Sequence, residues 1–228
     1  MNQIEALQRL RTLETPVVES RDVAALLQVS SSNATTILRR LARQGMIVHL
    51  SRGRWLVNER IDRLALPELI SAPYPAYVSL QSALFHHGLI EQIPSVVYAV
   101  TLSRPRRLQT PMGTISFHRI PSELFTGFEL SPRSDAKIAI PEKALFDLFY
   151  LAPGRSRVFS DQPELTIPPR FQWQRLKAYT KLVKSAARSA YIAERIRSLR
   201  SMQVASRPSS PRRRPATSNA GCRLRLRR

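Results

Sequence analysis

One stretch governs the fold of the N-terminal part of the chain, residues 20–57, SRDVAALLQVSSSNATTILRRLARQGMIVHLSRGRWLV. Apolar residues recur in it at spacings of three and four, which predicts one helix over residues 21–27 and another from residue 31 to about 44. A serine precedes each helix as a candidate N-cap, and Gly45 follows the second helix as a left-handed terminator. Only Gln28-Val29-Ser30 separates the two helices. Such a short turn lets them pack at a wide angle, so that the second helix projects from the surface.

The segments on either side complete the pattern. Two short strands are predicted at residues 46–50 and 55–58, joined by an Arg52-Gly53-Arg54 turn in which the glycine suits the tight reversal. Upstream, residues 2–13 have the apolar spacing of a further helix. Three helices followed by a hairpin are the element order of a winged helix-turn-helix. We therefore assign residues 1–60 to a DNA-binding domain of that kind.

The helix predicted from residue 31 to about 44 carries side chains that suit a DNA groove. Asn33 can form two hydrogen bonds with the edge of an adenine, and serine or threonine hydroxyls can contact base edges or phosphates. Arginines later in the helix and in the turn suit backbone phosphates. Between residues 20 and 58, six basic residues stand against one acid, Asp22. The predicted DNA-binding residues are therefore Ser31, Ser32, Asn33, Thr35, Thr36, Arg39, Arg40, Arg43, Arg52 and Arg54.

The charge of the whole chain is a poorer guide to function. The 228 residues carry a formal net charge of +20. Residues 170–228 hold 17 of the 36 basic residues and one acid, Glu194, whereas residues 1–169 have a net charge of only +4. The last part, residues 206–228, is rich in Arg, Pro and Ser and is expected to form a disordered basic tail. Such a tail attracts polyanions in general, so its charge does not show that the N-terminal domain binds DNA.

Several classes of protein are disfavoured by composition. The single cysteine, Cys222, excludes a disulfide framework or a cysteine-built zinc site within one chain. No apolar run approaches the roughly 18 residues of a membrane span, so no membrane partner is expected. The first residues lack the apolar core of a signal peptide, which predicts a cytoplasmic protein. No Gly-rich phosphate loop or nucleophile elbow is present, and we expect no cofactor, no metal site and no enzymatic activity.

A second region follows a connector at residues 61–75. Residues 76–200 mix helix and strand signals, which predicts a mixed α/β domain ending in two helices and places the whole chain in the α+β (α/β) class. Ser79 is expected to be the N-cap of the first helix. The Arg104-Pro105-Arg106-Arg107 stretch is expected to be an exposed connector. Helices are predicted at residues 77–89, 141–149, 171–188 and 190–200, and strands at residues 96–102, 114–120 and 137–140.

An enzymatic alternative rests on three residues of this region. Asp135, Lys137 and Glu142 are spaced somewhat like the acid-x-Lys ends of metal-dependent nucleases, which would make the protein a Mg²⁺-dependent enzyme acting on DNA. Such a site needs a further acid from a separate strand, and the sequence identifies none. We interpret Glu142-Lys143 instead as a solvated helix start. Core or surface positions, rather than metal ligation, are expected for the histidines His86, His87 and His118.

Several blocks of the chain match a known family. They are RGRWL at 52–56, YVSLQSAL at 77–84, HGL at 87–89, VYAVT at 97–101, TPMG at 110–113, FHRI at 117–120 and AIPEKALFDL at 139–148. With these blocks, the chain from about residue 1 to 200 resembles the AbiEi-type antitoxins of type IV, abortive-infection toxin–antitoxin systems. The family usually has threonine or serine where Ile140 stands here. The loss of that capping hydroxyl costs the following helix about 1 kcal/mol.

The resemblance implies a function. In that family a winged helix binds inverted repeats in its own promoter and represses the operon. A second domain neutralises a nucleotidyltransferase-like toxin, directly or through shared targets, and no catalytic residues are assigned. By position, Ser32, Asn33, Thr35, Thr36, Arg39 and the arginines of the turn take the DNA-binding role. The remaining alternative is a stand-alone winged-helix regulator that responds to a small molecule.

Overall fold

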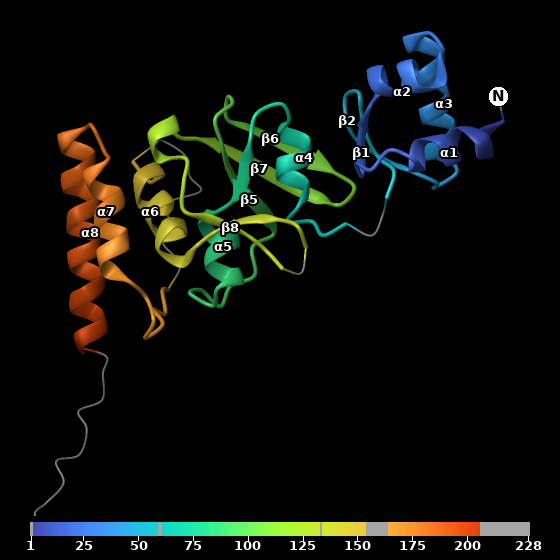
Figure 1. Cartoon of the computed structure of the whole chain (residues 1–228). Helices are drawn as coiled ribbons and strands as arrows, with labels where there is room; N and C mark the ends of the chain where they lie inside the picture. Colours follow the sequence, from blue (N-terminus) through green and yellow to red (C-terminus); the bar gives the residue numbers. More distant parts are fainter. Residues whose placement is uncertain (1, 59–60, 133, 154–163, 206–228) are drawn as a thin grey trace, which may run out of the picture.

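The computed structural model describes residues 2–58, 61–132, 134–153 and 164–205 (Figure 1). Within these ranges the chain is a mixed α/β protein with eight α-helices, one short 3-10 helix and two sheets, which confirms the predicted class. None of the helices in this part of the chain is long and apolar enough to cross a membrane. The basic tail predicted at residues 206–228 lies outside the described residues.

The N-terminal unit, residues 2–58, contains the predicted helices and hairpin and one further strand. The three strands form an antiparallel sheet in the order β1-β3-β2. Ala6, Leu10, Val23, Leu38 and Trp55 belong to the core that the helices and this sheet share. The elements are α1 (Gln3–Arg11), β1 (Val17–Glu19), α2 (Ser20–Leu27), α3 (Ser31–Arg43), β2 (Val48–Ser51) and β3 (Arg54–Leu56).

Two left-handed residues shape the segment around α3. Gln28 has φ 53° and ψ 44° at the end of α2, where the predicted three-residue turn begins. Gly45 has φ +69° just after α3, a conformation that costs glycine little. Ser30 is the N-cap of α3, and its hydroxyl accepts a hydrogen bond from the Asn33 amide at 3.3 Å. The local sequence therefore sets both ends of the exposed helix.

The second unit, residues 61–205, is built on a six-stranded mixed sheet. Its strand order is β6-β7-β5-β4-β9-β8; β4 pairs with β9, and β5 with β7, in parallel. The central strand β4 is buried on both faces, as its apolar Ala-Tyr-Val sequence requires. The strands are β4 (Ala76–Val78), β5 (Val96–Thr101), β6 (Arg106–Thr110), β7 (Gly113–Arg119), β8 (Phe128–Leu130) and β9 (Lys137–Ala139).

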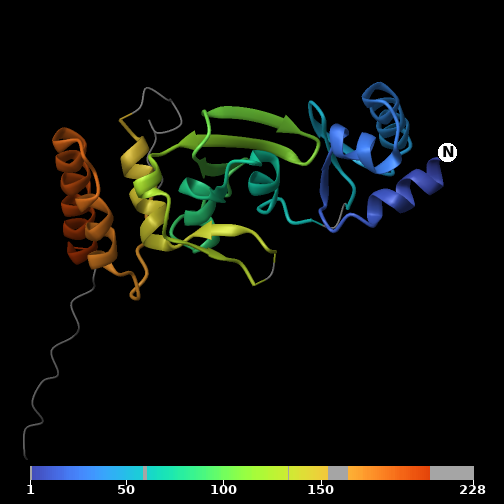
Figure 2. The same ribbon diagram turned by 45° about the horizontal axis from the view of Figure 1, so that its top comes forward.

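Helices cover this sheet and extend the unit away from the N-terminal unit. Every residue from Glu142 to Tyr150 of α6 is buried, because α5 packs on one side of the helix and α7 and α8 on the other. In Figures 1 and 2, α7 and α8 lie at the end of the molecule farthest from α1–α3. The helices are α4 (Leu66–Ser71), α5 (Leu80–His86), η1 (Ser122–Leu124), α6 (Pro141–Leu151), α7 (Trp173–Lys181) and α8 (Ala186–Ala205).

Three expectations for the second unit were wrong in detail. The helix predicted at residues 77–89 begins only at Leu80, because its first residues form β4. Ser79 is the N-cap residue, but its side chain does not cap; it donates instead to Asp147 at 2.8 Å. The connector predicted around Arg104–Arg107 is partly the edge strand β6. The short strand β8 was not predicted.

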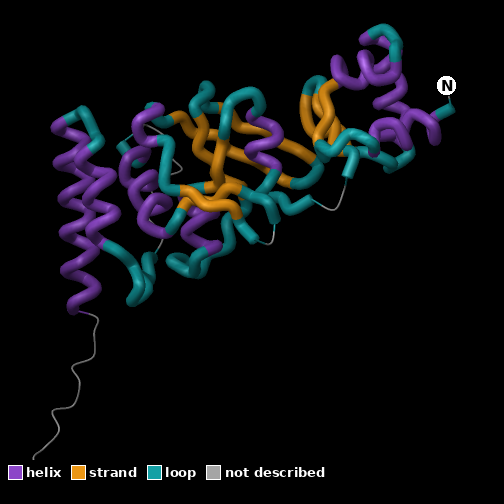
Figure 3. The backbone as a smooth tube through the Cα atoms, in the orientation of Figure 1, coloured by secondary structure: helices purple, strands orange, loops and turns teal. Residues whose placement is uncertain are grey.

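The two units share a continuous apolar core. Val17, Leu50 and Leu56 of the N-terminal sheet pack in the same cluster as Ile115 and Phe117 of β7. The N-terminal sheet consequently lies between the three N-terminal helices and the large sheet (Figure 3). Burial of these apolar side chains stabilises the packing of the N-terminal hairpin against the second unit.

Candidate nucleic-acid interface

α3 has one face in the core and one face toward solvent. Ala34, Leu38 and Leu41 are fully buried against the N-terminal unit. The opposite face holds most of the predicted DNA-binding residues. Thr35 is half-buried, and the exposed members are Ser31, Ser32, Asn33, Thr36, Arg39, Arg40 and Arg43. The segment is therefore not covered by the rest of the described chain.

The hydroxyl groups of α3 are oriented by the helix itself. Thr35 donates to the Ser31 carbonyl at 2.9 Å and Thr36 to the Ser32 carbonyl at 3.0 Å. Their oxygens remain able to accept hydrogen bonds. No acid occurs in the first turn, so the amide groups at the helix start keep their positive partial charge. This end of the helix is chemically suited to an anion.

The arginines on the same side form no salt bridges with other described residues. They are Arg39, Arg40, Arg43 and Arg52. Surface arginines in proteins of mixed charge are often close to an acid, whereas these four leave their charge to solvent. A polyanion approaching α3 would meet them without displacing an internal partner.

A groove of about 600 Å³ joins α3 to the β2–β3 hairpin. On one wall lie Thr35, Arg39 and Arg43, and on the other Arg52 and Gly53. The exposed helix and the hairpin tip therefore face the same side of the molecule. An exposed helix of polar and basic side chains therefore lies beside a basic turn, and both are chemically suited to contact a polyanion.

Arg54 differs from the expectation for the turn. Its side chain is only 18% exposed, pairs with Glu19 at 3.1 Å and donates to the carbonyl of Ala72 at 2.6 Å. The difference arises because Arg52 lies in the turn, outside the strands, whereas Arg54 is the first residue of β3 and faces the second unit. Arg52 is exposed toward solvent, whereas Arg54 ties β3 to the end of α4.

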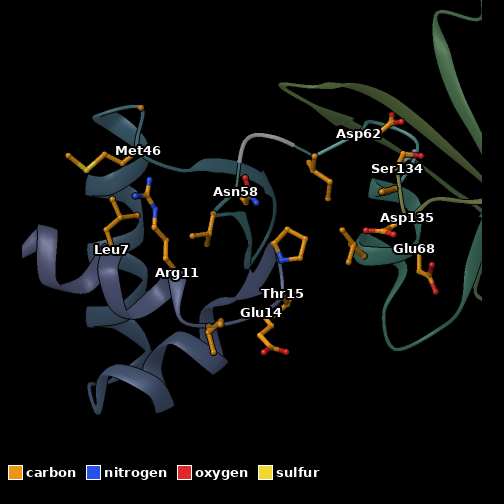
Figure 4. A pocket seen from close by; sticks show the side chains of 17 residues that line it. Leu7, Arg11, Glu14, Thr15, Met46, Asn58, Asp62, Glu68, Ser134 and Asp135 are labelled. Atoms are coloured by element: carbon orange, nitrogen blue, oxygen red, sulfur yellow. The ribbon is translucent and has the colours of Figure 1, made fainter. Parts of the chain in front are cut away.

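A further groove, of about 1250 Å³, lies between the two units. In Figure 4, Arg11 and Met46 border it from the N-terminal unit, and Asp62, Glu68 and Asp135 from the second. Four acids and one base line it, which is the opposite balance to the α3 face. This groove is therefore unsuited to a polyanion.

The three residues of the nuclease alternative are engaged separately. Asp135 lines the groove between the units, and Lys137 pairs with Glu68 of α4. Glu142 is buried and accepts a hydrogen bond from the Gln172 amide at 2.7 Å. Across the described residues, no three His, Cys, Asp or Glu side chains are grouped so as to hold a metal ion.

The interpretation of Glu142-Lys143 as a solvated helix start was wrong. Lys143 is fully buried, and its ammonium group lies 2.5 Å from the carboxylate of Asp147, one turn later in α6. Tyr77 and Ser79 of the β4 segment also donate to Asp147, at 2.9 and 2.8 Å. Burial raises the pKa of the Asp147 carboxyl, although its three donors act in the opposite direction. Burial and the adjacent Asp147 raise the pKa of Tyr77 well above its ordinary value.

This buried polar cluster holds α6 on the central strand. The ring of Tyr179 on α7 covers it, with the Lys143 ammonium 5.4 Å from the ring centre. Solvent reaches neither Lys143 nor Asp147, since both side chains have no exposed surface. The cluster was missed because charged residues one turn apart usually lie on a surface. The signal that could have found it is the apolar character of α6 after Lys143, where Asp147 is the only charged residue.

The predicted histidines are divided between surface and partly buried positions. His86 is exposed, and the His87 ring lies 2.8 Å from the carbonyl of Ala139. The His118 ring lies 3.0 Å from the Ser116 hydroxyl, and burial lowers its pKa to about 4. The α3–hairpin face thus remains the part of the described surface whose chemistry points most directly to a ligand. No protein-family model matches the chain, and no curated protein is significantly similar to it.

Proposed function

We propose that this protein is a DNA-binding transcriptional repressor and the antitoxin of a type IV toxin–antitoxin system. The observation that carries the DNA-binding part is the exposed, polar and cationic face of α3, with Arg52 across a shared groove. The antitoxin part rests on the resemblance of residues 1–200 to that family. The protein then acts in the cytoplasm, without catalysis or a bound cofactor.

In the proposed complex, α3 lies in the major groove as the recognition helix of a winged helix-turn-helix. Its first turns, with Ser32, Asn33 and Thr36, face base edges, where asparagine pairs best with adenine. Arg39 and Arg43 contact the backbone that borders the groove. Arg52, at the hairpin tip, enters or borders the adjacent minor groove. Inverted repeats in the promoter of its own operon are the proposed operator.

A binding assay on the DNA upstream of the gene tests this proposal. Wild-type protein should shift fragments that contain discrete repeats at concentrations that leave unrelated DNA free. Asn33→Ala and Arg39→Ala should each weaken that specific binding about 5- to 150-fold, since a good base or phosphate contact contributes about 1–3 kcal/mol. Arg197→Ala, which removes an exposed arginine of α8, is the matched control. Specific binding that survives both α3 substitutions would contradict the assigned recognition helix.

The antitoxin role has a separate test. Cells that express the neighbouring nucleotidyltransferase-like gene should stop growing, and co-expression of this protein should restore growth. The α3 variants should still restore growth when both genes are placed under foreign promoters, because neutralisation is assigned to the second unit. Growth arrest that persists with wild-type protein present would favour the stand-alone regulator instead.

A further inference from the structure

The β2–β3 hairpin stands between two grooves rather than beside one. The first is the groove shared with α3. The second, of about 520 Å³, lies between the hairpin and the second unit. Ser20, Arg52 and Gly53 line both grooves, whereas Trp55 lines only the first and its neighbour Arg54 only the second. Because adjacent residues of a strand point to opposite faces, the two grooves lie on opposite flanks of the hairpin. The far wall of the second groove is formed by Ile70 of α4 and Arg106 of the edge strand β6.

The second groove has a surplus of positive charge. Its lining contains four arginines, Arg21, Arg52, Arg54 and Arg106, and one acid, Glu19. Glu19 already forms salt bridges with two of them, at 2.8 Å from Arg21 and 3.1 Å from Arg54. Among the described residues, Arg52 and Arg106 form no salt bridge. The positive charge that lines the second groove is thus only partly balanced by negative charge.

Arg106 is held in place while its charge stays uncompensated. Its guanidinium lies 4.7 Å from the centre of the Phe117 ring and donates to the carbonyl of Ile70 at 3.2 Å. The residue is nonetheless exposed. Partial burial and the neighbouring charge of Arg54 lower the pKa of Arg106. Two guanidinium groups that repel each other beside an open groove are an arrangement that a bound anion would stabilise.

We propose that the second groove binds the phosphate backbone on the far side of the minor groove that the hairpin enters, so that the second unit contacts DNA through Arg106. This inference rests on the proposed DNA-binding function. A minor groove is about 6 Å wide and is bordered by two backbones. When α3 lies in the major groove, the DNA backbone that separates the major from the minor groove lies in the groove between α3 and the hairpin. The backbone on the opposite side of the minor groove then lies on the other flank of the hairpin, next to Arg106.

Ethylation interference on the operator is the direct test. Wild-type protein should be blocked by ethylated phosphates on both sides of one minor groove, with the far set assigned to the second unit. Arg106→Gln should relieve interference at the far phosphates alone. It should also reduce the slope of log K against log salt by about 0.9, the value for one lost phosphate contact. Arg106→Lys retains the charge and should restore the slope, whereas Arg197→Ala should change neither measurement.

The outcomes separate this inference from the function on which it rests. If wild-type protein shows no specific binding, or the α3 variants bind as well as wild type, the proposed function itself fails. If the α3 variants lose binding while Arg106→Gln keeps both the full salt slope and the far interference, only the second contact is refuted. A thermal melt of Arg106→Gln guards against a displaced β6. Should that variant unfold, the absence of far interference with wild-type protein still overturns the inference.

Discussion

The buried pair of Lys143 and Asp147 allows the sharpest test of the packing of the second unit. Asp147→Asn is nearly isosteric and leaves two of the three donors, Tyr77 and Ser79, with an acceptor. The Lys143 ammonium, however, loses its countercharge in a site without solvent contact. Breaking such a pair on one side costs about 3–5 kcal/mol, because an uncompensated charge stays buried.

The change should be visible as a large loss of stability. For a chain of this size it corresponds to a fall in Tm of about 6–20 °C. Urea unfolding at neutral pH, followed by far-ultraviolet circular dichroism, measures the free energy directly. The double variant Lys143→Met/Asp147→Asn removes both charges and keeps the volume of the lysine stem, so it should recover most of the loss.

A matched control comes from the surface. Glu194→Gln breaks the exposed pair with Arg197, whose side chain is 74% accessible, and should change stability by less than about 1 kcal/mol. The reasoning is refuted if Asp147→Asn is within about 1 kcal/mol of wild type. It is equally refuted if the double variant is no more stable than Asp147→Asn alone, since the buried charge would then not be the cause.

Three further predictions concern pH, packing and DNA affinity. Burial lowers the pKa of His118 to about 4, against an ordinary value of 6.5. Between these two pH values the unfolded chain binds a proton at His118 that the folded chain does not. The free energy of unfolding should therefore fall by up to about 3 kcal/mol as the pH drops from 6.5 to 4. His118→Gln should flatten that part of the pH profile, and identical profiles would exclude His118 as its source. Gly127→Ala places a methyl group against the Tyr179 hydroxyl and should cost more than Gly45→Ala, which meets nothing within 4 Å; equal losses in urea would contradict the clash. If wild-type protein makes four phosphate contacts, its affinity for the operator should fall about 150-fold between 50 and 200 mM salt. Arg43→Ala removes one contact, so its affinity should fall only about 40-fold over the same range. Fluorescence anisotropy measures both values, and an unchanged salt slope would show that Arg43 does not contact DNA.

Elements with a complete local pattern could be predicted from the sequence. α3 has apolar residues at helical spacing, a serine before its first turn and a glycine after its last, and its observed bounds, Ser31–Arg43, differ little from those expected. Five strands, β1, β3, β4, β8 and β9, have only three residues and are too short to show alternation. β3 and β9 were predicted because a turn precedes the one and Pro141 follows the other, whereas β1 and β8 were not predicted. β4 was assigned to a helix because nothing local indicates that its neighbours in the sheet are β5 and β9.

The site residues divide in the same way. Exposure on α3 follows from helical periodicity, so Asn33 and Arg39 lie on the solvent side as expected. The orientation of Arg54 depends on Glu19 and the end of α4, which are distant in sequence and could not be anticipated. The buried carboxylate of Asp147 takes two of its donors from a strand about seventy residues earlier, and only the folded chain brings them together.

The apolar cluster that joins Val17, Leu50 and Leu56 to β7 has a consequence for how two copies could occupy neighbouring repeats. Because this shared core packs the N-terminal unit against the second, each bound copy would present its second unit at one angle around the duplex axis. Any contact between adjacent copies is then periodic in the distance between repeats, with a period of about 10.5 base pairs. Inserting five base pairs would turn the second copy to the opposite side of the DNA, while ten would bring it back.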